Sequence, residues 1–85
     1  MRTKNENLNL KIGSKAKIAR VTGCIDAQGL AKSIKESGLV IGEHGSTVAI
    51  VTTWSDGWAR IRLPDDSSYP GLTMDVPMAC LDSIS

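Results

Sequence analysis

The sequence predicts a single, small and mainly β domain with one short helix. Short runs rich in β-branched residues end at Gly, Pro or Asp, which is typical of strands and turns. An Asp-Gly pair separates two such runs, as in a β-hairpin. Helical spacing of apolar residues is confined to one segment near residue 30. A chain of 85 residues forms one domain with a thin core.

The N-terminal part is expected to contain a disordered tail and the first strand. Residues 1–9 are polar and show no periodicity, so we assign the folded domain to residues 10–85. They also lack the apolar stretch of a secretory signal. The first strand is expected over Lys15–Val21, where Ala16 and Ile18 alternate with lysines.

A short helix is expected over about Ala27–Glu36. Asp26 is a suitable N-cap, and Ile25 and Leu30 on either side of it have the spacing of a hydrophobic staple. Gly29 in the first turn weakens the helix by about 1 kcal/mol relative to alanine. A long irregular loop is therefore the alternative for this segment.

The sequence also contains a stop signal for this helix. Gly38 can adopt the left-handed conformation that ends a helix. Leu39 can then contact Ile34, as in a Schellman motif.

Extended structure is expected from residue 39 to the end of the sequence. The expected strands are Leu39–Ile41, Ser46–Trp54, Trp58–Leu63 and Leu72–Val76, with a last short strand near Ser83–Ile84. Prolines mark two strand ends, Pro64 and Pro77, because proline cannot donate to a β-ladder. Met78–Leu81 can form one tight helical turn before the last strand.

The Asp56-Gly57 pair is the most informative turn signal, because it sets the register of a hairpin. A two-residue turn pairs Trp54 with Ala59, which separates an apolar face from a face that carries the arginines. The apolar face would contain Val48, Ile50, Thr52, Trp54, Ala59, Ile61 and Leu63.

A three-residue loop would instead pair Trp54 with Trp58. Both rings, Val48 and Ile50 would then share a face with the arginines, which segregates apolar and polar side chains less well. We therefore expect the two-residue turn, with Trp54 in the core and Trp58 on the solvent side.

This register predicts a binding surface. Trp58, Arg60 and Arg62 stand in line on one strand, and Tyr69 follows in the next loop. Tryptophan and arginine are enriched among the residues that dominate protein interfaces. We expect a protein-interaction module without catalytic activity, whose partner is another protein or a second copy of the chain. The alternative is that Trp58 lies under the N-terminal tail or the helix and that the arginines only solvate a strand.

Charge is unevenly distributed along the chain and suggests a second function. Residues 1–35 hold eight of the ten Lys and Arg residues but only two of the nine acidic residues. Lys11, Lys15, Lys17 and Arg20, together with the two arginines of the hairpin, could bind nucleic acid. A sequence pI near 7.8 is low for such a domain. The alternative is that the first and last strands pair, so that the opposite charges meet within the fold.

The order of strands and turns resembles the SH3-like barrel superfamily, including bacterial SH3 and KOW-type modules. The resemblance covers residues 10–84 and rests on the first strand, the hairpin around Asp56-Gly57 and the ending Asp75–Leu81. It implies a small five-stranded barrel, in which a strand, a proline and a short helical turn lead into the final strand. For KOW-type modules it also implies nucleic-acid binding. The aromatic pairs that bind polyproline in peptide-binding SH3 domains have no clear counterpart here, and fold alone does not define function.

Other chemistry is not expected. His44 is the only histidine, and its spacing from Cys24 and Cys80 matches no metal-ligand or catalytic motif. The Asp65-Asp66 pair fits a turn better than a catalytic dyad. We expect no cofactor, no metal and no small-molecule substrate. Two widely spaced cysteines and the absence of a long apolar run indicate a cytoplasmic protein without membrane contact, and the compact form suggests a bacterial or phage accessory protein.

Overall fold

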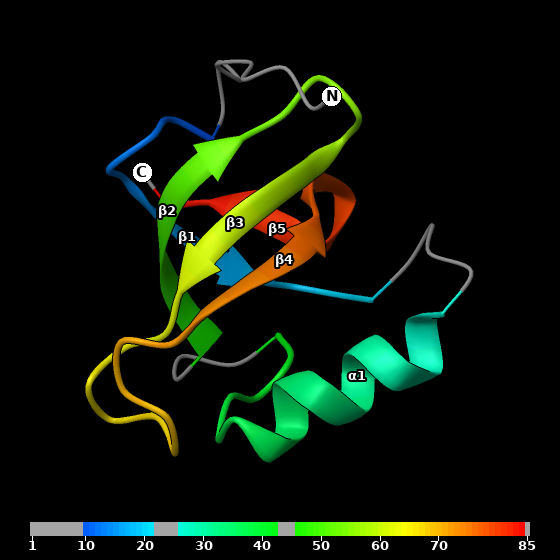
Figure 1. Cartoon of the computed structure of the whole chain (residues 1–85), viewed down its shortest axis with the longest axis vertical. Helices are drawn as coiled ribbons and strands as arrows, with labels where there is room; N and C mark the ends of the chain where they lie inside the picture. The colour runs from blue at the N-terminus through cyan, green and yellow to red at the C-terminus, as the bar shows by residue number, and fades with distance from the viewer. Residues whose placement is uncertain (1–9, 22–25, 43–45, 85) are drawn as a thin grey trace.

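The computed structural model describes residues 10–21, 26–42 and 46–84 (Figure 1). The chain order is β1 (Lys15–Ile18), α1 (Ala27–Glu36), β2 (Thr47–Thr53), β3 (Trp58–Arg62), β4 (Thr73–Pro77), a 3-10 turn η2 (Met78–Cys80) and β5 (Leu81–Ser83). The predicted mainly β class with one short helix is confirmed. The predicted tail at residues 1–9 lies outside the described residues. No helix within the described ranges is long and apolar enough to span a membrane.

The five strands form one antiparallel sheet in the order β4-β3-β2-β1-β5. The first and last strands are therefore neighbours, and Lys17 of β1 lies opposite Asp82 of β5. Arg20, just beyond β1, forms an ion pair with Asp82, at 3.3 Å. The basic and acidic parts of the sequence thus meet at this edge of the sheet. Closure of the sheet into an SH3-like barrel stays a prediction.

The helix begins and ends where its sequence signals predict. Asp26 occupies the N-cap position, although its side chain makes no capping hydrogen bond. At the other end Gly38 has a φ of +85°, its N–H donates to Lys35 O, and the Leu39 N–H donates to Ile34 O. These two bonds define a Schellman motif. The expected staple residue Ile25 lies outside the described residues.

The helix is joined to the sheet through its C-terminal end. Ile34 and Leu39 are buried in the core, and Leu30 packs against it while partly exposed. The Ser68 N–H in the β3–β4 loop donates to Ser37 O at 2.8 Å, so this loop and the end of α1 lie side by side (Figure 1).

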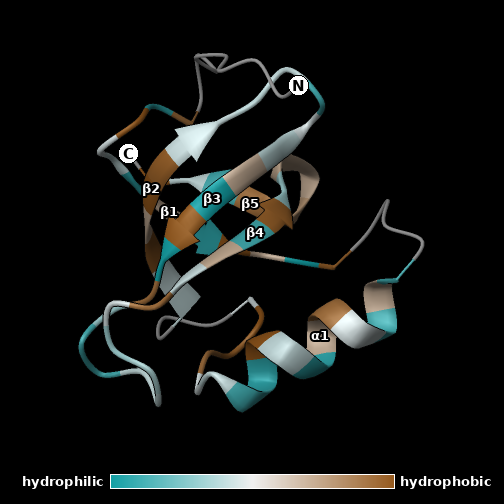
Figure 2. Cartoon of the chain, in the orientation of Figure 1, coloured by the Kyte–Doolittle hydropathy of each residue, from teal (hydrophilic) through white to brown (hydrophobic). Residues whose placement is uncertain are grey.

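The core lies on the inner face of the sheet. Hydropathy alternates along β3, where teal and brown bands follow one another (Figure 2). Ala59 and Ile61 of β3 are fully buried, whereas Arg60 and Arg62 are exposed. Further buried members of this cluster are Ala16, Ile18, Val48, Ile50, Leu63, Val76 and Leu81.

The predicted strand at Leu39–Ile41 is wrong. Leu39 completes the Schellman motif and turns into the core, and Ile41 and Gly42 form a turn. The Gly42 N–H donates to Ile18 O at the end of β1. Only residues 39 and 40 lie between the turn that ends the helix and the turn at Ile41 and Gly42, which is too short a segment to pair as a β-strand. β1 itself ends at Ile18, short of the expected Val21, because the backbone N–H groups of residues 19 and 20 both point to Cys80 O.

The predicted two-residue hairpin turn is also wrong. The Trp54 N–H donates to Trp58 O at 2.9 Å, Thr53 lies opposite Ala59, and Thr52 lies opposite Arg60. The loop therefore has three residues, Ser55–Gly57.

A β-bulge in β2 makes the three-residue loop compatible with a buried apolar face. The register shifts between Ile50 and Thr52, which leaves Val51 as an extra residue on β2. Val48 and Ile50 thus remain in the core, while the end of β2 changes face. Regular alternation with a three-residue loop would place Val48 and Ile50 on the face of the arginines. The extra residue Val51 keeps them on the core face.

Candidate functional site

The outer face of the sheet carries the predicted binding residues of β3. We use this name for the surface opposite the core, formed by Lys15, Lys17, Ala49, Thr52, Trp54, Trp58, Arg60, Arg62 and Asp75. Its members come from β1 to β4, with Trp54 next to β2. Residues from both halves of the sequence therefore contribute to one surface.

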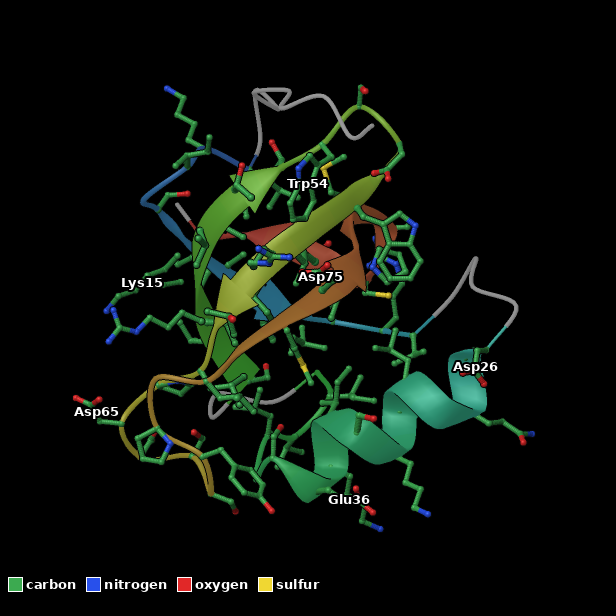
Figure 3. All side chains as sticks on the ribbon, in the orientation of Figure 1. Lys15, Asp26, Glu36, Trp54, Asp65 and Asp75 are labelled. Carbon is green, nitrogen blue, oxygen red and sulfur yellow. The ribbon has the colours of Figure 1, made fainter. Side chains whose placement is uncertain are left out.

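Arg60 is held in place from two directions on this face. Its guanidinium carbon lies 5.0 Å from the centroid of the Trp54 ring. Its Nε and Nη2 atoms donate to the two carboxylate oxygens of Asp75 on β4, at 2.8 and 3.4 Å. A cation–π contact of this kind is worth about 0.5–1 kcal/mol. Figure 3 shows Trp54 and Asp75 reaching the β3 ribbon from different sides.

Trp54 and Trp58 lie opposite each other but differ in exposure. Trp54 is 8% exposed, so its predicted burial is correct although its predicted register is not. It is buried outside the main core cluster, on the face of Arg60. Trp58 is half-buried and lies opposite Pro77 of β4. Trp58 is therefore neither fully exposed, as on a free solvent face, nor fully covered, as it would be under the N-terminal tail or the helix.

The hairpin tip that carries Trp58 is anchored at both ends. Asp56 Oδ1 accepts a hydrogen bond from the Trp58 N–H at 3.1 Å. The Met78 N–H donates to Gly57 O at 2.8 Å, which ties the tip to η2. These bonds fix the backbone from which Trp58 projects.

Arg62 and Lys15 occupy one row across the sheet. Lys15 lies opposite Ala49 of β2, and Ala49 lies opposite Arg62 of β3. Lys17 stands in the next row, opposite Thr47. None of these three cations forms an ion pair with another described residue.

The remaining predicted residues do not join this surface. Arg20 is engaged with Asp82 beyond β1, and Lys11 is exposed in the turn before β1. Tyr69 is 55% exposed in the β3–β4 loop. This loop follows the end of β3, whereas Trp58 begins the strand, so the length of β3 separates the two aromatic rings.

Sequence reasoning missed Asp75 and Trp54 as parts of the surface. Their roles depend on which strands are neighbours and on the bulge at Val51, and neither is encoded in residue spacing. Asp75 in the expected strand Leu72–Val76 was the one available signal, because a charge on a β-strand usually faces solvent or a cross-strand partner.

A groove adjoins the row of Lys15 and Arg62. It has a volume of about 380 Å³, and its lining includes Pro64, Asp65 and Asp66 from the start of the β3–β4 loop. Within residues 10–21, 26–42 and 46–84, no three His, Cys, Asp or Glu side chains gather as metal ligands. The candidate residues His44 and Cys24 lie outside these ranges.

Comparison of the chain with protein-family models, with curated proteins and with solved structures found no match.

Proposed function

We propose that this chain is a binding domain without catalytic activity, which recognises another protein through the outer face of its sheet. The observation that carries the proposal is the combination of one preorganised arginine with three cations that have no ion-pair partner among the described residues. Such a face attracts a partner with negative charge.

The fixed position of Arg60 supports a protein partner. A side chain that is already ordered by Trp54 and Asp75 loses little conformational entropy when it is buried in an interface. Trp58, next to it on the same strand, offers apolar area on an anchored backbone. A half-buried tryptophan beside an arginine is typical of the residues that dominate binding energy.

The charge of this face favours a different protein over a second copy. In a two-fold dimer the same surface meets itself, so the cations of the two copies would lie close together. Pairing through the free edge of β4 is also disfavoured, because Asp75 and Pro77 lie on that strand and both discourage strand addition.

Nucleic-acid binding is the second candidate. Lys15, Lys17 and Arg62 share one face, which supports contact with phosphates. Lys11 and Arg20, the other two cations expected to take part, stand apart from this face.

A cytoplasmic location and a role as a bacterial or phage accessory protein belong to the same proposal. Cys80 is completely buried, where cysteine packs as a small apolar side chain. This arrangement is compatible with a reducing compartment.

Affinity co-purification from the producing cells, followed by mass spectrometry, tests the protein-binding proposal. Trp58→Ala and Arg62→Glu should each remove the partner, whereas Tyr69→Ala and Lys35→Glu should retain it because both residues lie off the outer face. Arg62→Glu guards against a folding defect, since Arg62 is exposed and forms no ion pair with a described residue. A partner that both outer-face variants retain would contradict the proposal. Gel shifts at low and high salt test the nucleic-acid alternative, and no shift at low salt would exclude it.

A further inference from the structure

The groove beside Lys15 and Arg62 contains charges of both signs. Its lining includes Lys15, Ala49, Arg62, Pro64, Asp65 and Asp66. A volume of about 380 Å³ holds a few amino-acid side chains. The inference below deepens the proposed function and rests on it.

The cationic wall can clamp a single anionic group. Lys15 and Arg62 flank Ala49 in one row of the sheet, so two strand spacings of about 4.8 Å separate their backbones. Alanine leaves the floor between the two long side chains free of bulk. A carboxylate placed there would accept charge-assisted hydrogen bonds from both cations.

The acidic wall is built on a closed turn. The Ser67 N–H and the Ser67 hydroxyl both donate to Pro64 O, at 3.1 and 2.7 Å. Asp65 and Asp66 are the two central residues of this turn. The following Ser68 N–H is tied to Ser37 O at the end of α1, which anchors the loop on its far side.

The two walls are kept apart. Neither Asp65 nor Asp66 forms an ion pair with Lys15 or Arg62, although all four line one groove. Figure 3 shows Lys15 and Asp65 projecting from the same side of the molecule. The groove therefore presents a positive and a negative site, both unneutralised within the described part of the chain.

We propose that this groove binds a mixed-charge segment of the partner protein. An acidic side chain of the segment binds between Lys15 and Arg62, and a nearby basic side chain binds at Asp65 and Asp66. A nucleic-acid strand fits the groove less well, because its evenly spaced phosphates would bring one negative charge against the two aspartates. The aspartates thus select a protein segment over a polyanion.

The test is a titration of the ¹⁵N-labelled chain with short probes, followed by NMR. The probes are blocked alanine hexapeptides that carry one glutamate and one lysine, one glutamate and one glutamine, or one lysine and one glutamine, and a single-stranded oligothymidine. The mixed peptide should shift the amide signals of Lys15, Ala49, Arg62, Asp65 and Asp66 in a saturable manner. Its affinity should exceed that of either singly charged peptide by about fivefold, as expected for one added ion pair at a partly exposed site.

Two double variants and one matched control complete the design. Asp65→Asn with Asp66→Asn should abolish the preference for the mixed peptide over the glutamate peptide and raise oligothymidine affinity by about tenfold. Lys15→Gln with Arg62→Gln should abolish binding of the glutamate peptide. Lys32→Gln with Lys35→Gln removes two positive charges from the exposed side of α1, as Lys15→Gln with Arg62→Gln does from the groove. It should change neither the preference for the mixed peptide nor the binding of the glutamate peptide.

The outcomes separate this inference from the proposed function. Equal affinity of the mixed and glutamate peptides for the unmodified chain overturns the mixed-charge site. The proposed binding function is tested separately, by the co-purification of the Trp58→Ala and Arg62→Glu variants. Amide shifts confined to other residues overturn the groove as the site. Well-dispersed amide signals in each variant show that a loss of binding is not a loss of fold.

Discussion

Replacement of Gly38 by alanine tests how the helix is joined to the sheet. Gly38 has a φ of +85°, a conformation that costs an L-residue about 1–2 kcal/mol. A Cβ atom at this position would also lie 2.6 Å from Ser68 Oγ and 2.7 Å from the Ser68 backbone nitrogen. The Ser68 backbone must therefore move, which breaks its hydrogen bond to Ser37 O.

The expected cost is the sum of these two effects. The lost hydrogen bond contributes about 1 kcal/mol. Together with the backbone strain, Gly38→Ala should lower the free energy of unfolding by about 2–3 kcal/mol. This is a large fraction for a domain of this size, whose total stability is about 4–13 kcal/mol. The melting temperature should fall by about 4–8 °C for each kcal/mol.

Gly13→Ala is the matched control, measured by urea unfolding alongside Gly38→Ala. Gly13 has the same φ of +85°, but a Cβ atom added there would meet no described atom within 4 Å, so this variant carries the backbone strain without the contact. Gly38→Ala should cost about 1 kcal/mol more than Gly13→Ala. Ser68→Ala should rescue Gly38→Ala only slightly, because the backbone nitrogen remains. Equal costs for the two glycine variants would refute the role assigned to the Ser68 contact.

Three further predictions concern two buried threonines of β2, the helix and the outer face. Thr52 Oγ1 is buried without a hydrogen-bond partner among the described residues, so Thr52→Val should raise the unfolding free energy by about 1 kcal/mol. Thr53 is fully buried and has a partner, so Thr53→Val should lower the unfolding free energy. Calorimetry that shows a loss for Thr52→Val and a gain for Thr53→Val would contradict this account of the two side chains. Gly29→Ala should stabilise the domain by about 0.5 kcal/mol in urea unfolding, because alanine has the higher helix propensity. The added Cβ would lie 2.8 Å from Asp26 Oδ1, and moving this flexible carboxylate costs less than the propensity gained. A loss of stability would show that the carboxylate is fixed. Asp75→Asn should cost less than about 1 kcal/mol at low salt and less still at 1 M salt, since the Arg60 pair is partly exposed, and a salt-independent loss would contradict this account.

Local signals in the sequence predicted the helix well. Asp26 and Gly38 bracket it, and at Gly38 the positive φ restricts the choice of residue. The expected bounds Ala27–Glu36 therefore agree with the structure. The segment after it was misread because Leu39–Ile41 is apolar enough for a strand. Only the Schellman geometry shows that Leu39 belongs to the end of the helix.

The candidate site was predicted in part, for a physical reason. Alternation along β3 correctly assigns Ala59 and Ile61 to the core and Arg60 and Arg62 to the outer face. On β2 the same rule fails after Val51, because a bulge changes the face without changing composition. Cross-strand neighbours such as Asp75 depend on strand order, which residue spacing does not specify.

The pairing of β1 with β5 has a consequence for synthesis on the ribosome. One of the two neighbours of β1, Leu81–Ser83, is made more than 60 residues after it. Until those residues leave the exit tunnel, one edge of β1 is open to other chains. Nascent β1 carries Lys15 and Lys17, and these charges reduce non-native strand pairing during that interval.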